Sequence, residues 1–116
     1  MLKYNKGEVM NKKQRMDLYN KAEKEWGLVA QYDQAIEEMG ELIVAINKYK
    51  RKCLFGEYKN NPKIEDNLAE EIADVKMCLE QLEEYMGSKK VAKIFNKKLQ
   101  KLADEIQYMK DLKNGK

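Results

Sequence analysis

The chain has 116 residues, of which 43% are hydrophobic and 37% are charged, with six glycines and one proline. This length fits a single domain, and the composition excludes both a disordered tail and a turn-rich all-β fold. Histidine is absent, which excludes a Ser-His-Asp triad, a Cys-His pair and a histidine-ligated zinc or haem site. The net charge is only +3, from 23 basic and 20 acidic residues, so the charge does not indicate a surface that binds nucleic acid in general. Any catalytic chemistry therefore comes from carboxylates, lysines, arginines or a hard metal ion.

Two sequence features bear on where the protein works. Cys53 and Cys78 form no CxxC pair, and the N-terminus has no secretory segment, so we expect reduced thiols. No apolar run approaches the ~20 residues that a membrane span needs. The sequence therefore predicts a cytoplasmic protein without a membrane partner.

Two helices are predicted in the first half of the chain. The first begins after the N-cap Asn11 and ends at Trp26, where Gly27 interrupts it. The second ends in a basic turn at 48–52, which suits the negative end of a helix dipole. Its apolar residues recur in steps of four and three, typical of the buried side of a packed helix. This series is Leu28, Tyr32, Ala35, Met39, Leu42, Ile46 and Tyr49, and Ile36 and Ile43 widen it.

Two more helices are predicted after an irregular stretch at 53–66. The third has Asn67 as its N-cap, with Glu70 in the capping-box position, and Gly87 ends it. Ser88 is expected to cap the fourth helix. The apolar series are Leu68, Ile72, Val75, Leu79, Leu82 and Met86 in the third helix, and Val91, Ile94, Phe95, Leu99, Leu102, Ile106 and Met109 in the fourth.

These elements predict an all-α fold, an antiparallel four-helix bundle that forms one domain over 1–116. Residues 1–9 are expected to be a frayed lead-in, and 113–116 a polar tail. Small bundles with apolar residues on several helices gain core by pairing, so we also expect an oligomer.

A partial internal repeat carries the functional signal. The segments 37–46 and 70–79 both read Glu-Glu-x-x-acid-apolar-x-x-small-apolar. In each, two acids lie three residues apart, so at ~100° per residue they share one side of a helix. The four acids are Glu38, Glu41, Glu71 and Asp74. If the second and third helices face each other, all four carboxylates converge beside the core.

Such a cluster predicts a cation. Close carboxylates cannot all stay ionised in a low dielectric unless a cation joins them. Oxygen ligands without nitrogen or sulfur favour Mg²⁺, with Mn²⁺ as the other candidate, and such a metal also binds substrate phosphates. Small residues one turn later, Ala45 and Cys78, are expected to leave room between the helices. A third pair, Glu80 and Glu83, has no counterpart on the second helix and is expected at the surface.

The two halves of this pattern resemble the MazG-type all-α nucleoside triphosphate pyrophosphohydrolases, in particular small single-domain members from bacteria and phages. Their signature is E-x-x-E on one helix and E-x-x-D on the next, and 38–41 and 71–74 match it in residue type and order. The resemblance covers about 26–102. It implies Mg²⁺-dependent cleavage of a ribo- or deoxyribonucleoside triphosphate to the monophosphate and pyrophosphate, for nucleotide pool control or clean-up. It also places the four acids as metal ligands in the catalytic site and implies a homodimer or homotetramer.

Further residues are candidates for holding such a substrate. Trp26 can stack on a base or anchor the packing, and Gln31 can hydrogen-bond a base or sugar. Basic residues near the acidic pairs can meet the triphosphate, although a solvated helix end explains the first three equally well. These basic residues are Lys48, Lys50, Arg51, Lys97, Lys98 and Lys101.

A different class of function also fits the sequence. A non-catalytic helical module that oligomerises through its apolar faces needs the acidic residues only for solubility. Nucleic-acid binding through the lysine-rich last helix is less favoured because the central helices carry acidic clusters.

Overall fold

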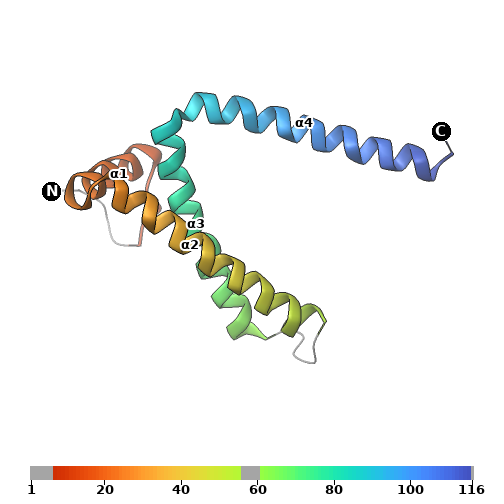
Figure 1. Ribbon diagram of the computed structural model, residues 1–116, viewed down its shortest axis with the longest axis horizontal. Coiled ribbons are helices and arrows are strands. Elements are labelled where there is room, and N and C mark those ends of the chain that lie inside the picture. Colours follow the sequence, from red (N-terminus) through yellow and green to blue (C-terminus); the bar gives the residue numbers. More distant parts are fainter. Residues whose placement is uncertain (1–6, 56–60, 116) are drawn as a thin grey trace. The chain divides into compact units, whose positions relative to one another are not determined.

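The computed structural model describes residues 7–55 and 61–115 and contains four α-helices and no strand within them (Figure 1). The all-α class is therefore confirmed. The chain divides into two compact units, 1–82 and 83–116, which are described separately. None of the helices in the described ranges is both long enough and apolar enough to cross a membrane. The elements are α1 (Lys12–Trp26), α2 (Leu28–Tyr49), the π-helical segment η1 (Lys50–Leu54), α3 (Pro62–Met86) and α4 (Ser88–Lys113).

Helix α1 begins and ends where the sequence predicts. Asn11 accepts a hydrogen bond from the backbone N–H of Gln14 at 2.9 Å, and the Gln14 side chain accepts one from the Asn11 N–H at 2.9 Å. This reciprocal pair is a capping box with glutamine in the place of glutamate. Gly27 has φ +91°, a conformation that other residues adopt only with strain. A single glycine thus turns the chain from α1 into α2.

The basic turn after α2 remains helical but is wound more loosely. The Phe55 N–H donates to the carbonyl of Lys50 at 3.1 Å, which is an i to i+5 bond of a π-helix. Lys50 and Arg51 are exposed in this segment, whereas Cys53 is buried. The helical path therefore extends past the predicted end, into the stretch expected to be irregular.

Helix α3 begins six residues earlier than predicted, with its N-cap at Asn61 instead of Asn67. The Asn61 side chain accepts from the backbone N–H groups of Lys63 at 3.1 Å and Ile64 at 3.4 Å, so Asn61 caps the helix. Pro62 occupies the first helical position, where its fixed φ is favourable and its missing N–H has no cost. The prediction of Asn67 as N-cap is wrong, since Asn67 lies inside α3. The rest of the predicted irregular stretch, 56–60, lies outside the described residues.

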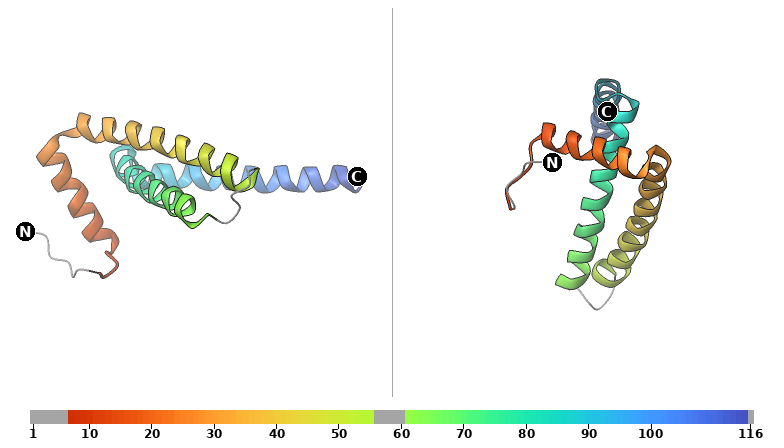
Figure 2. Two further views of the ribbon diagram at one scale, coloured as in Figure 1. Left: turned by 90° about the horizontal axis from the view of Figure 1, so that it is seen from below. Right: turned by 90° about the vertical axis from the view of Figure 1, so that its left-hand side faces the viewer.

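Helices α2 and α3 run antiparallel and side by side (Figure 2). A hydrogen bond joins Gln31 to Gln81, and seven residues further along α2 Glu38 lies beside Asp74, seven residues earlier in α3. Small residues are buried along both helices: Ala35, Ala45 and Cys78 are 3%, 2% and 1% exposed. Ala45 therefore packs into the core instead of leaving space, whereas Cys78 lines a cavity described below.

The buried side of α2 is rotated from the predicted one. Ile36 and Ile43, expected to widen the apolar side, are 69% and 61% exposed, while Gln31 is buried. The small side chains of Ala35 and Ala45 are buried on this side of α2 instead. The edge that carries the acidic residues consequently faces α3.

Glu80 joins α3 to α1 through side-chain hydrogen bonds. It was predicted at the surface, but its side chain is only partly exposed. The Arg15 guanidinium donates to both Glu80 oxygens, at 2.7 and 3.2 Å, and the Tyr19 hydroxyl donates to Oε1 at 2.7 Å. Burial, followed by the bond to Glu80, raises the pKa of Tyr19 to about 12, so this hydroxyl keeps its proton at neutral pH. The hydrogen bond from Arg15 holds the pKa of Glu80 below its ordinary value of 4.5.

Replacement of Glu80 by glutamine is expected to lower stability at neutral pH but not in acid. A carboxyl whose pKa is lower in the folded state stabilises the fold above its unfolded pKa of 4.5, and this contribution disappears as pH falls through the folded pKa. Urea unfolding followed by circular dichroism should show a lower midpoint for E80Q at pH 7 and a smaller difference at about pH 3. The exposed neighbour variant E83Q should match the unchanged protein at both pH values. Equal midpoints for E80Q and E83Q at pH 7 would contradict this role.

Helix α4 is amphipathic along its whole length. It begins after Gly87, whose φ is +102°, so Ser88 is the first helical residue and not the predicted cap. The predicted tail, 113–116, starts one residue too early, because α4 ends at Lys113. Residues 1–6 of the predicted lead-in and residue 116 lie outside the described residues. α4 buries none of its residues. Its exposed apolar residues include Ile94, Phe95, Leu99, Leu102, Ile106 and Met109.

Candidate functional site

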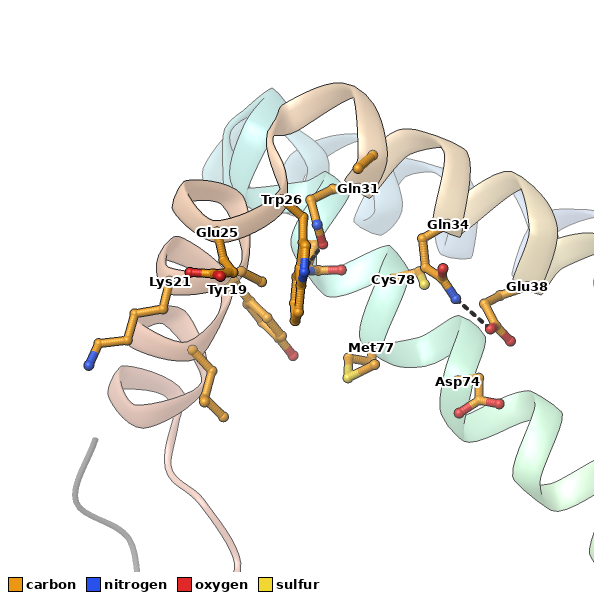
Figure 3. A pocket seen from close by; sticks show the side chains of 14 residues that line it. Tyr19, Lys21, Glu25, Trp26, Gln31, Gln34, Glu38, Asp74, Met77 and Cys78 are labelled. Atoms are coloured by element: carbon orange, nitrogen blue, oxygen red, sulfur yellow. Dashed lines mark hydrogen bonds between the residues drawn. The ribbon is translucent and has the colours of Figure 1, made fainter. Parts of the chain in front are cut away.

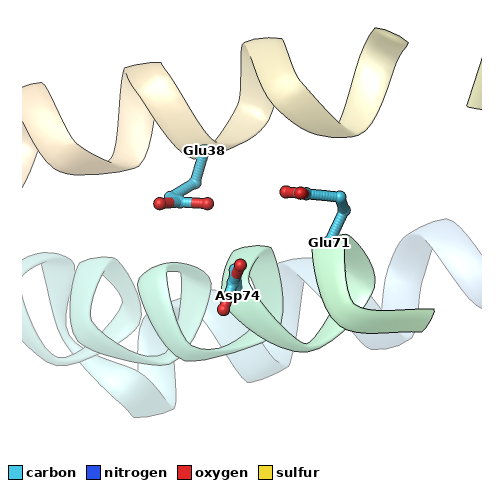
Figure 4. A group of neighbouring side chains, drawn as sticks. All are labelled: Glu38, Glu71 and Asp74. Carbon is cyan, nitrogen blue, oxygen red and sulfur yellow. The ribbon is translucent and has the colours of Figure 1, made fainter. Parts of the chain in front are cut away.

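Three carboxylates from two helices converge between α2 and α3 (Figure 4). Glu38 comes from α2, and Glu71 and Asp74 come from successive turns of α3. One oxygen of each lies within 4.8 Å of one oxygen of both others. The acidic cluster, as we call these three residues, contains three of the four acids that the internal repeat singled out.

The fourth acid, Glu41, lies one turn further along α2 and is exposed. It is not part of the acidic cluster. Its negative charge nevertheless adds to the effect of desolvation and raises the pKa of Glu38. Glu41 therefore influences the acidic cluster from its rim.

The surroundings of Glu38 disfavour its ionised form. Desolvation, followed by the charges of Glu41 and Asp74, raises the pKa of Glu38, and the hydrogen bond from Gln34 to Glu38 Oε1 at 2.7 Å opposes this only in part. The Oε2 atoms of Glu38 and Glu71 are buried and have no hydrogen-bond partner among the described residues. Buried carboxylate oxygens normally have partners, so this cluster has capacity to bind a proton or a cation.

The acidic cluster opens into a cavity of about 810 Å³ formed by α1, α2 and α3 (Figure 3). Glu38 and Asp74 stand at one end of it, and Gln34 bridges from the wall to Glu38. The lining is mostly apolar, and the volume suits a small organic ligand. Its residues are Leu18, Tyr19, Lys21, Ala22, Glu25, Trp26, Ala30, Gln31, Gln34, Glu38, Asp74, Met77, Cys78 and Gln81.

Both residues predicted to hold a nucleotide line this cavity. Trp26 is 69% exposed, so it is not the packing anchor that the alternative interpretation required. Gln31 is buried and accepts a hydrogen bond from Gln81 Nε2 at 3.2 Å. Sequence reasoning missed Gln81, although a signal was present: Asp74, Cys78 and Gln81 recur in steps of four and three along one side of α3.

The predicted phosphate-binding residues are exposed and do not line the cavity. Lys48 is in the last turn of α2, and Lys50 and Arg51 are in η1. Lys97, Lys98 and Lys101 belong to α4, in the second unit. A role for these six residues stays a prediction.

No protein-family model, no curated protein and no solved structure matches this chain. The residues themselves and their geometry are therefore the basis for a functional proposal.

Proposed function

We propose that the protein is a Mg²⁺-dependent nucleoside triphosphate pyrophosphohydrolase, which converts a ribo- or deoxyribonucleoside triphosphate to the monophosphate and pyrophosphate. One observation carries the proposal: three carboxylates from two helices gather together, and two of them, Glu38 and Asp74, line a cavity large enough for a nucleotide. The resemblance of 38–41 and 71–74 to the MazG-type signature supports the same reaction.

The donor set of the acidic cluster fits a hard divalent cation. Glu38, Glu71 and Asp74 offer only oxygen, and two of these residues have a buried oxygen without a hydrogen-bond partner in the described residues. A cation there relieves the repulsion that raises the pKa of Glu38. Mg²⁺ accepts a few carboxylates and keeps sites for water and phosphate oxygens, and Mn²⁺ has similar preferences. Glu41 is the nearest additional ligand.

The chain's own residues prepare the reaction site. When bound, the cation supplies charge neutralisation for the phosphates and a lowered pKa for an attacking water. Gln34 donates a hydrogen bond to Oε1 of Glu38, and Oε2 of Glu38 remains available to a cation because it has no hydrogen-bond partner among the described residues. The apolar wall that includes Leu18 and Met77 limits water around the substrate.

We further propose that the helices assemble as an antiparallel bundle within a homodimer or homotetramer. The support is the number of exposed apolar side chains, on α2 and α3 as well as on α4. Surfaces of this kind are rarely left in contact with water. In such an assembly the basic residues of α4 are candidates for contacts with the triphosphate.

The same exposed apolar residues favour a second candidate, a non-catalytic oligomerisation or interaction module. The two candidates differ in their response to metal, because only the enzyme needs the acidic cluster to bind a cation.

Thermal unfolding with and without Mg²⁺ or Mn²⁺ separates them. The unchanged protein should melt at a higher temperature with metal, by an amount equivalent to about 2.7 kcal/mol at 100 times the dissociation constant. E71Q should lose this response, whereas E70Q, which removes the same charge from the neighbouring exposed position, should retain it. Indifference of the unchanged protein to both metals would favour the module.

A further inference from the structure

The cavity contains hydrogen-bonding groups that the protein does not use. Gln31 and Gln81 are only 9% and 7% exposed. A primary amide has two N–H donors and an oxygen with two acceptor sites. Within the described part of the chain, however, these side chains make one hydrogen bond, from Gln81 Nε2 to Gln31 Oε1. The amide pair therefore offers a free donor, Gln31 Nε2, and a free acceptor, Gln81 Oε1, at the cavity wall.

The amide pair and the acidic cluster are set a fixed distance apart. Gln31 precedes Glu38 by seven residues in α2, and Gln81 follows Asp74 by seven residues in α3. At a rise of 1.5 Å per residue, each helix separates the two features by about 10 Å. Both features line the same cavity. This separation suits one molecule whose phosphates lie at the carboxylates and whose base, beyond the sugar, reaches the amides.

The cavity wall beside the amide pair suits an aromatic ring. Trp26 presents an indole beside Gln31 (Figure 3), and Ala22, Ala30 and Met77 complete an apolar surround. Flat rings stack favourably on such a surface, provided that their polar edge finds hydrogen-bond partners. The amide pair supplies these partners.

We infer that Gln31 and Gln81 together bind the hydrogen-bonding edge of the substrate's nucleobase, an inference that rests on the proposed nucleotide function of the cavity. The amide pair can bind a base whose edge has a donor and an acceptor in either order. If both amides turn over, Gln31 donates to Gln81, and the free donor and acceptor exchange places. A base with C=O beside N–H and a base with an amino group beside a ring nitrogen both satisfy it.

The base therefore contributes to substrate binding, but its identity matters little. We expect kcat/KM values for the four common deoxynucleoside triphosphates to lie within about tenfold of one another, because each forms the same number of bonds.

The test compares the unchanged protein with the double variant Q31M/Q81M on nucleotides and on 2-deoxyribose 5-triphosphate, which has no base. Changing both residues leaves no orphaned amide, so the fold is retained more readily than in either single variant. The double variant should raise KM for every nucleotide about tenfold with little change in kcat, as expected for one or two lost neutral hydrogen bonds. It should leave kcat/KM for the base-free triphosphate unchanged. Gln100→Met, at an exposed position of α4, is the matched control.

The outcomes distinguish this inference from the proposed function. Equal effects of Q31M/Q81M on nucleotides and on the base-free triphosphate would overturn the inference and leave the proposed function standing. Absence of triphosphate hydrolysis by the unchanged protein would overturn both.

Discussion

Glu38→Gln and Asp74→Asn should each reduce Mg²⁺-dependent triphosphate hydrolysis about a thousandfold or more, corresponding to the loss of several kcal/mol of transition-state stabilisation by a misplaced or missing ion. Each substitution keeps the size of the side chain and removes one negative ligand from the acidic cluster. Steady-state release of pyrophosphate at saturating Mg²⁺ measures the effect.

The fold should survive the change at Glu38. A carboxyl whose pKa is raised in the folded state contributes stability below its unfolded pKa of 4.5, and this contribution is lost as pH rises through the folded pKa. At neutral pH the ionised Glu38 therefore lowers the stability of the fold when no metal is added, and a neutral glutamine at this position removes that effect. Without metal, E38Q should melt at or above the temperature of the unchanged protein.

The neighbouring variant E37Q is the control for charge. Glu37 is exposed on α2 and lies outside the acidic cluster, so its replacement should leave hydrolysis within about twofold. Full activity in E38Q, or a loss in E37Q as large as that in E38Q, would remove the assignment of the acidic cluster.

Ala45→Leu should destabilise the protein by about 1–3 kcal/mol, the usual cost of adding methylene and methyl groups to a well-packed core. Ala45 is 2% exposed where α2 packs closely, so a leucine there has to displace a helix or adopt a strained rotamer. Urea unfolding followed by the helical circular dichroism signal gives the free energy of unfolding.

Val44→Leu tests whether this effect is local to the packed side. Val44 is the adjacent residue but is 66% exposed, so its enlargement should change the free energy of unfolding by no more than about 0.5 kcal/mol. If A45L were as stable as V44L, the burial of Ala45 in a well-packed core would be contradicted.

Sequence reasoning predicted the helices better than their orientation. The N-cap Asn11 and the glycines at 27 and 87 give local signals, because capping and positive φ depend on few residues. The start of α3 was missed because Asn67 and Asn61 both precede plausible first turns, and only Asn61 is followed by a proline at the first helical position. The rotation of α2 was missed because a count of apolar residues gives more weight to Ile36 and Ile43 than to the alanines, whereas the structure buries Ala35 and Ala45 and exposes both isoleucines.

The same contrast holds for the candidate site. The acidic residues repeat on two helices at three-residue spacing, so the convergence of Glu38, Glu71 and Asp74 followed from helical periodicity once the helices were paired. The prediction that Glu41 joins them is wrong, because its side chain is exposed. The partners of Glu80 and of Gln31 lie 50 to 65 residues away in the sequence, and no local pattern indicates them. Tertiary contacts of single polar residues depend on the register between helices, which the sequence of either helix does not contain.

The identity of the products tests the central claim most directly. The full chain is incubated with a deoxynucleoside triphosphate, with Mg²⁺ or with chelator, and the products are separated and quantified. We predict equal amounts of nucleoside monophosphate and pyrophosphate, formed only with the metal. A panel of ribo-, deoxyribo- and modified triphosphates then ranks the substrates. Intact triphosphate in every reaction, or release of orthophosphate and nucleoside diphosphate in place of monophosphate and pyrophosphate, would contradict the account.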